Sequence, residues 1–169
     1  MDEHYTSMGK LGGTGASAAG ILIGNAMTRR PDLYRVVIDR VGMSDMLRYE
    51  TEPNGPPNVS EMGSIKTDEG FHSLYTMSAY QHLHGGVAYP AVMYTTGAND
   101  PRVAPWQMLK MAARTQATTS SGLPVLLRIE YDAGHGIGSN RSQLEEQRAD
   151  EWAFALWQMG DPAFQPTSP

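Results

Sequence analysis

One serine near the start of the chain lies among residues small enough to form a tight turn. The segment reads Gly15-Ala16-Ser17-Ala18-Ala19-Gly20. A serine on a sharp turn from a strand into a helix presents its hydroxyl as a nucleophile, and the positions two residues either side must be small because the neighbouring backbone is close. Gly15 and Ala19 occupy those positions, where the usual pattern has glycine at both. The segment therefore predicts Ser17 as a nucleophile.

The same segment also resembles the cofactor loop of short-chain dehydrogenases, over Thr14 to Ile21. Asp39, about 20 residues further on at a strand end, would then bind a ribose. Two features oppose this interpretation: the preceding residues 8–13 are poor in Val and Ile, and no Tyr-x-x-x-Lys pair follows. We expect Asp39 to be a strand-end residue in a turn or an ion pair, and nucleotide binding remains an alternative.

Two further residues of hydrolytic chemistry follow Ser17 along the chain. Asp100 lies in the segment TTGANDPRVAPW and His135 in YDAGHGIG. The order serine, acid, histidine is that of α/β-hydrolases. His135 would take the hydroxyl proton of Ser17 and later give it to the leaving group, while Asp100 would fix the imidazole tautomer. Asp132 is a second acid beside the histidine, and we expect it to be structural.

The elements predicted around these residues alternate between strands and helices. Strands are expected at 10–15, 34–39, 88–96 and 123–131, and helices at 17–30, 68–84, 105–117 and 143–159. Such alternation predicts an α/β fold with a mostly parallel sheet of about four strands and helices on both faces. Functional residues of such sheets lie at the carboxyl ends of the strands, and Ser17, Asp100 and His135 follow three of those ends.

The composition narrows the class of protein. A chain of 169 residues with 40% hydrophobic residues suits one folded domain. The net charge of −5 without a basic patch argues against a nucleic-acid partner. The absence of Cys excludes disulfides and thiolate chemistry. No apolar run approaches the roughly 18 residues of a membrane span, and the acidic, polar N-terminus does not read as a signal peptide, so we expect a cytoplasmic location.

Other candidate features carry weaker signals. His82 and His84 have metal-like spacing but no third ligand nearby, so we expect neither a metal nor a cofactor. Four large side chains at helical spacing are expected in the core: Met108, Met111, Trp152 and Trp157.

Five segments together resemble one family. GASAAG, RPDLY, VGMSDML, TTGANDPRVAPWQ and DAGHGIG are similar to the catalytic domain of the prolyl oligopeptidase family of serine peptidases, from about Tyr5 to Met159. The resemblance implies a partial α/β-hydrolase domain over 1–160, a flexible tail over 161–169, and Ser17, Asp100 and His135 as the catalytic triad. It also implies that Arg102 contacts a substrate carbonyl, and the alternative is an ion pair on the same loop.

The resemblance suggests hydrolysis of a peptide through an acyl-enzyme. The backbone N–H of Ala18 would be one oxyanion donor because it follows the nucleophile. The family's second donor is a tyrosine upstream of the matched region, so a carboxylesterase acting on small esters and a non-catalytic remnant are alternatives. The strand before Ser17 is central in the whole family domain, and we expect a homo-oligomer that covers its exposed edge.

Overall fold

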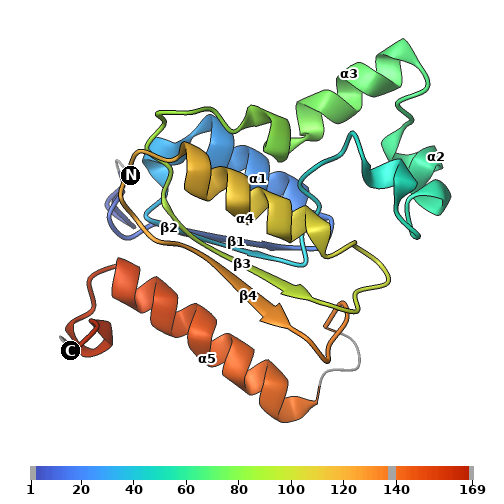
Figure 1. Cartoon of the computed structure of the whole chain (residues 1–169). Coiled ribbons are helices and arrows are strands. Elements are labelled where there is room, and N and C mark those ends of the chain that lie inside the picture. The colour runs from blue at the N-terminus through green and yellow to red at the C-terminus, as the bar shows by residue number, and fades with distance from the viewer. Residues whose placement is uncertain (1–2, 137–139, 168–169) are drawn as a thin grey trace.

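Four parallel strands form one sheet at the centre of the molecule (Figure 1). The structure, a computed structural model, describes residues 3–136 and 140–167. The strands are β1 (Gly12–Ala16), β2 (Val36–Arg40), β3 (Ala91–Gly97) and β4 (Val125–Glu130), in the order β1-β2-β3-β4. The predicted parallel α/β sheet is therefore confirmed, and its carboxyl ends lie along one edge.

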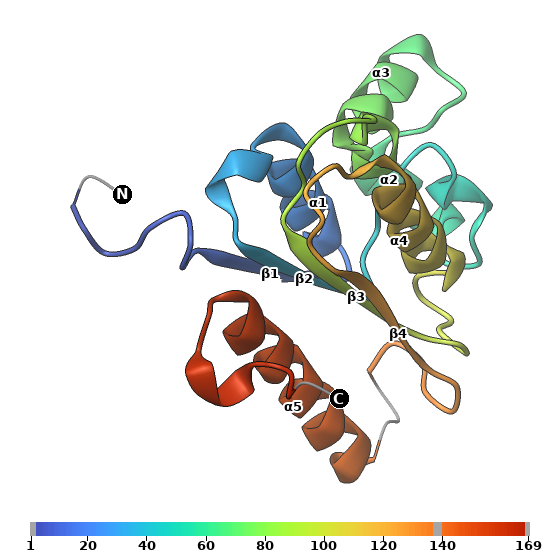
Figure 2. The same ribbon diagram turned by 60° about the vertical axis from the view of Figure 1, so that its left-hand side comes forward.

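Helices cover both faces of the sheet (Figures 1 and 2). Helices α1 (Ala19–Arg29) and α4 (Trp106–Thr118) lie on one face, and α5 (Arg141–Gln158) lies on the other. The short helices α2 (Val59–Met62) and α3 (Asp68–Met77) belong to the long connection between β2 and β3. None of the helices within residues 3–136 and 140–167 combines the length and apolarity needed to cross a bilayer.

The alternation of side chains along each strand builds two core layers. Val37 of β2 and Tyr94 of β3 pack with residues of α1 and α4. Val36 and Met93, their sequence neighbours, pack with Phe154 of α5 on the opposite face. All seven residues of β3 are buried, because the strand lies inside the sheet with a helix layer on each side.

The helix expected over 68–84 ends earlier, at Met77. Ser78 leaves the helical backbone conformation with φ −90° and ψ 89°. Its hydroxyl accepts from the backbone N–H of Met46 at 2.8 Å and contacts the carbonyl oxygen of Ser44 at 3.3 Å. These long-range contacts hold the break, which sequence periodicity does not reveal; residues 79–82 then form a 3-10 turn.

The expected core is correct except for one aromatic residue. Met108 and Met111 are fully buried, and Trp157 packs edge-on against Phe154 with ring centroids 5.9 Å apart. The prediction for Trp152 is wrong, since its side chain is 66% exposed. The inner face of α5 is occupied by Phe154 and Ala155, and Trp152 lies beside the open edge of β1 instead. After Gly160 the chain forms a 3-10 turn over Pro162–Phe164, and the mobility of that tail stays a prediction.

Candidate active site

Ser17 lies on a strained turn between β1 and α1. Its φ of 57° is in the left-handed region that residues with a side chain rarely adopt. Three backbone hydrogen bonds hold the turn: the Ser17 N–H donates to Arg40 at 2.9 Å, and the Ser17 carbonyl accepts from Gly20 at 2.9 Å and Met43 at 3.1 Å. Strain of this kind costs about 1–3 kcal/mol and persists only where the surroundings fix it.

Close backbone contacts require small residues around Ser17. A Cβ at Gly15 would lie 2.5 Å from the carbonyl oxygen of Ala19. A Cβ at Gly20 would lie 2.5 Å from the Cα of Gly42. Ala19 itself is exposed, so alanine is tolerated there. The crowding on the helix side therefore falls at Gly20, one residue later than the sequence pattern suggests.

The structure brings together Ser17, His135 and Asp100. The Oγ of Ser17 lies 2.8 Å from Nε2 of His135, and Nδ1 of His135 lies 2.7 Å from Oδ2 of Asp100. Only 7% of the histidine side chain and none of the aspartate side chain is exposed. With the Nδ1 proton donated to Asp100, Nε2 is free to accept the hydroxyl proton of Ser17.

Two neighbouring loops bring the acid to the histidine. Asp100 follows β3 and His135 follows β4, and the N–H of Asn99 donates to the carbonyl oxygen of Ala133 at 3.1 Å. A Cβ at Gly97 would lie 2.2 Å from the carbonyl oxygen of Gly134, so the two loops need glycine at this contact. The close approach of these loops sets the distance between the carboxylate and the imidazole.

Ala18 and Arg102 lie beside the nucleophile and line one cavity with it. Within the described residues the N–H of Ala18 has no hydrogen-bond acceptor, as an oxyanion donor requires. Arg102 is exposed, and no ion pair among the described residues involves it. The structural ion pair considered for Arg102 is therefore absent from that part of the chain, which leaves its guanidinium available to a ligand.

The other candidates from the sequence do not join this site. Asp39 is buried at the end of β2, and in the described structure neither of its carboxylate oxygens has a hydrogen-bond partner, so the ion pair expected for it is absent there. Asp132 is exposed in a turn. Nε2 of His82 lies 3.0 Å from the carbonyl oxygen of Tyr75. No group of side chains suited to a metal ion occurs in residues 3–136 and 140–167.

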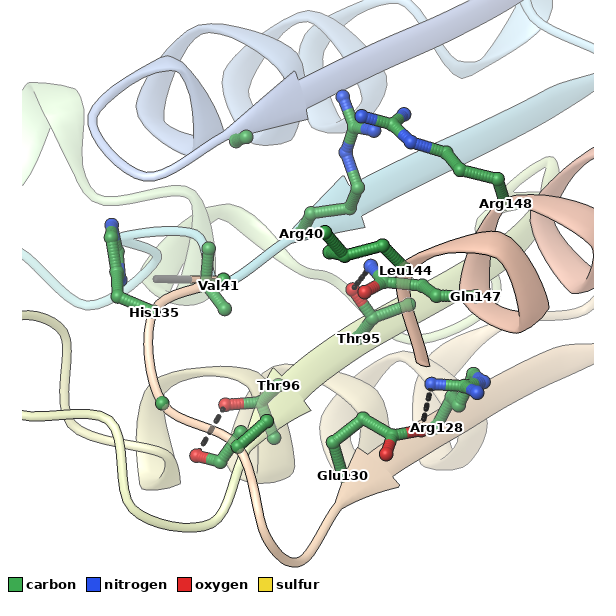
Figure 3. A pocket seen from close by; sticks show the side chains of 15 residues that line it. Arg40, Val41, Thr95, Thr96, Arg128, Glu130, His135, Leu144, Gln147 and Arg148 are labelled. Atoms are coloured by element: carbon green, nitrogen blue, oxygen red, sulfur yellow. Dashed lines mark hydrogen bonds and ion pairs between the residues drawn. The ribbon is translucent and has the colours of Figure 1, made fainter. Parts of the chain in front are cut away.

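A second cavity, of about 350 Å³, lies between the sheet and α5 and has His135 in its lining (Figure 3). Arg40 and Arg148 both contact the buried carboxylate of Glu151, at 3.3 and 3.4 Å. Arg128 pairs with Glu130 and with Asp150. The amide of Gln147 donates to Thr95 at 3.3 Å. The three arginines that line this cavity are all paired with carboxylates. We therefore interpret the lining as structural support for the site.

Comparison with known proteins gives a consistent result. The sequence model of the prolyl oligopeptidase family matches residues 1–162. The chain is 38% identical to a prolyl endopeptidase of Elizabethkingia miricola over 92% of its length, and 33% identical to one of Dictyostelium discoideum over 91%. It spans only 22% and 21% of those two relatives.

Solved structures agree with this result. A chain from a structural study of two prolyl endopeptidases superimposes with a TM-score of 0.90 at 34% identity, covering 94% of this chain and 23% of that one. Prolyl oligopeptidase B from Galerina marginata gives a TM-score of 0.87 at 26% identity, covering 94% and 22%. The nucleotide-binding alternative has no support in these findings. The fold, the family match over nearly the whole chain and the relatives together show that the chain belongs to the prolyl oligopeptidase family.

Proposed function

We propose that the chain is the catalytic part of a serine peptidase that hydrolyses peptide bonds through an acyl-enzyme. One observation carries the proposal: the continuous hydrogen-bonded line from Ser17 through His135 to Asp100, at 2.8 and 2.7 Å. The family membership supports peptides as substrates.

In this mechanism, the Oγ of Ser17 attacks the carbonyl carbon while its proton passes to Nε2 of His135. The N–H of Ala18 donates to the oxyanion that forms. When the intermediate collapses, His135 gives the proton to the leaving nitrogen, and the C–N bond breaks. A water then attacks the acyl-enzyme, again through His135, and releases the acid and Ser17. Asp100 accepts from Nδ1 throughout and stabilises the imidazolium, while Arg102 contacts a substrate carbonyl.

The experiment compares wild-type protein with Ser17→Ala and with Ser73→Ala, a matched change at an exposed serine of α3. We expect hydrolysis of a peptide p-nitroanilide, and labelling by a fluorophosphonate, in the wild type and in Ser73→Ala. Both are expected to fall to background in Ser17→Ala. Unchanged turnover in Ser17→Ala would refute the assignment of the nucleophile.

A carboxylesterase is the second candidate function. The observation that favours it is that Ala18 supplies the one oxyanion donor that we assign within the described residues. Loss of one such donor typically costs about 10²–10³ in rate, and activated esters need less of this help than amides. Turnover of a short p-nitrophenyl ester without peptide cleavage would select this candidate. No turnover of either substrate would indicate a non-catalytic remnant.

We also propose that a second copy of this chain covers the outer edge of β1. That strand ends the sheet order, so its outer N–H and C=O groups have no strand partner in the described structure. Beside it lies a groove of about 260 Å³ between β1 and α5, with Trp152, Ala155 and Met159 in its lining. An apolar groove next to an unpaired strand edge is a surface that association would bury.

A further inference from the structure

The cavity that contains Ser17 and Ala18 holds about 200 Å³. An engineered cavity of roughly 150 Å³ is large enough to hold benzene, so this one can receive a single large side chain. The nucleophile lies in the lining of this cavity. The substrate side chain that fills the cavity is therefore that of the residue whose carbonyl is attacked. The chemistry of the lining therefore selects that residue.

Part of the lining is apolar. Met43, Met62 and Val103 contribute hydrocarbon or thioether surface. The ring of Tyr49 also lines the cavity, and its hydroxyl donates to the carbonyl oxygen of Gly63. A wall of this kind suits the methylene groups of a long side chain.

The inner part of the lining carries a buried carboxylate. Glu52 is only 4% exposed, and its two oxygens accept from the side-chain amide of Gln107 and from the N–H of Ala104, the latter at 3.0 Å. A carboxylate offers about four acceptor positions, so two remain for a ligand. Burial raises the pKa of Glu52, and the carboxylates of Asp100 and Asp45 raise it further, against the effect of the two hydrogen bonds. A cation in the cavity would relieve this repulsion.

The rim adds acceptors and a second carboxylate. Glu61 is exposed and has no ion-pair partner among the described residues. The side-chain amide nitrogen of Asn58 donates to the carbonyl oxygen of Asn54 at 2.6 Å, which leaves the side-chain oxygen of Asn58 as an acceptor. Arg102 is the one cation in the described lining, and the proposed mechanism directs it to the substrate backbone.

We propose that this cavity selects a cationic side chain, of the lysine or arginine type, on the residue that precedes the cleaved bond. The inference rests on the proposed function, because it takes Ser17 as the nucleophile. A long alkyl stem would lie against the apolar wall and its charged head would reach Glu52 and Glu61. A neutral ring such as that of proline would bury Glu52 without compensating it, and desolvated carboxylates left unpaired are costly.

The test measures binding without turnover. Ser17→Ala protein is titrated calorimetrically with benzamidine and with benzamide, its neutral isostere. We expect benzamidine to bind at least tenfold more tightly. Introducing Glu52→Gln into the Ser17→Ala protein is expected to remove most of that preference. Introducing Glu61→Gln instead is expected to reduce the preference about two- to fivefold, as for an exposed charge pair. Glu69→Gln, an exposed carboxylate of α3 outside this cavity, removes the same charge and is the matched control.

Equal binding of the two probes would overturn the proposal, and so would a preference that neither glutamate variant changes. If Glu52→Gln does not fold, the isostere comparison and Glu61→Gln still decide. Active wild-type protein is then given acyl-arginine and acyl-proline p-nitroanilides, and we expect at least tenfold higher kcat/KM for the arginine substrate. A protein that prefers benzamidine but cleaves nothing would contradict the proposed function alone.

Discussion

Asp100 divides its two carboxylate oxygens between two tasks. Oδ2 faces the imidazole of His135, while Oδ1 accepts from the N–H groups of Arg102 at 2.8 Å and Val103 at 3.0 Å. The backbone therefore fixes the carboxylate in the orientation that the histidine needs. Since only one oxygen is available to the imidazole, the chemical nature of the atom at that position decides which tautomer His135 adopts.

At this position we expect Asp100→Asn to lower kcat about 10⁴-fold with little loss of stability. The asparagine oxygen can keep both backbone hydrogen bonds, which turns the amide nitrogen, a donor, toward Nδ1. Nε2 then carries the proton and cannot accept one from Ser17. Steady-state kinetics and a thermal melt measure the two effects. Activity within tenfold of the wild type would show that Asp100 does not orient the histidine.

Single residues differ in how far the sequence predicts them. Ser17, Asp100 and His135 each follow a predicted strand, so their shared edge could be expected, although their hydrogen bonds could not. Glu52 lies in an irregular segment without periodic pattern. Its position depends on Gln107, 55 residues further along the chain, and no local signal connects the two.

At the scale of elements, β2 places a carboxylate directly beneath the turn that holds Ser17. Asp39 pairs in register with Gly15 of β1 and Tyr94 of β3. A Cβ at Gly42 would lie 2.1 Å from its Oδ1, and one at Gly20 would lie 3.0 Å from it. Burial raises the pKa of Asp39 from its ordinary 3.8 to about 7. The pKa of Tyr94 is also raised, mainly by burial and to a smaller extent by the Asp39 carboxylate.

This raised pKa predicts a pH dependence of stability. Between about pH 4 and pH 7 the folded state holds a proton that the unfolded state has released, so stability falls as pH rises and the loss is complete above about 7. This pKa shift corresponds to a loss of at most about 4 kcal/mol in the free energy of unfolding. We expect Asp39→Asn to flatten this slope, measured as urea unfolding free energy against pH.

The control for this measurement is Asp132→Asn, a change at an exposed aspartate, which should keep the wild-type slope. The comparison uses the slope and not the absolute stability, because a buried asparagine also has polar atoms to satisfy. An unchanged slope in Asp39→Asn would mean that Asp39 is not protonated in the folded state.

The sequence predicts the elements better than their ends. Strands and helices alternate as expected because the apolar and β-branched segments of the sequence mark them. The break at Ser78 depends on contacts with Ser44 and Met46, which are more than 30 residues away. Such contacts do not alter the local pattern of the sequence.

At the scale of the whole molecule, the open edge of β1 predicts association. We expect a dimer or larger assembly at micromolar concentration, measured by light scattering after size exclusion. Trp152→Glu should shift the protein toward monomer, because it places a charge in the groove beside β1. Phe71→Glu, at a partly exposed aromatic of α3 outside that groove, is the control. A wild-type monomer would contradict the proposed self-association.

The overall arrangement of the strands and helices can also be predicted only partly from the sequence. The alternation of strands and helices indicates the fold class. The strand order is a property of the folded chain. The outward position of Trp152 is another, since this residue has the spacing of a core residue but is 66% exposed in the groove beside β1.

The strand order has a consequence for the protein during its synthesis. Each strand pairs with the one made just before it, so the sheet can grow in the direction in which the ribosome releases the chain. Ser17 is synthesised 118 residues before His135, which follows β4, the last strand of the described sheet. Under the proposed mechanism, a nascent chain therefore holds the Ser17 nucleophile before its base has been made, and the proposed hydrolysis can begin only after β4 and His135 have been synthesised.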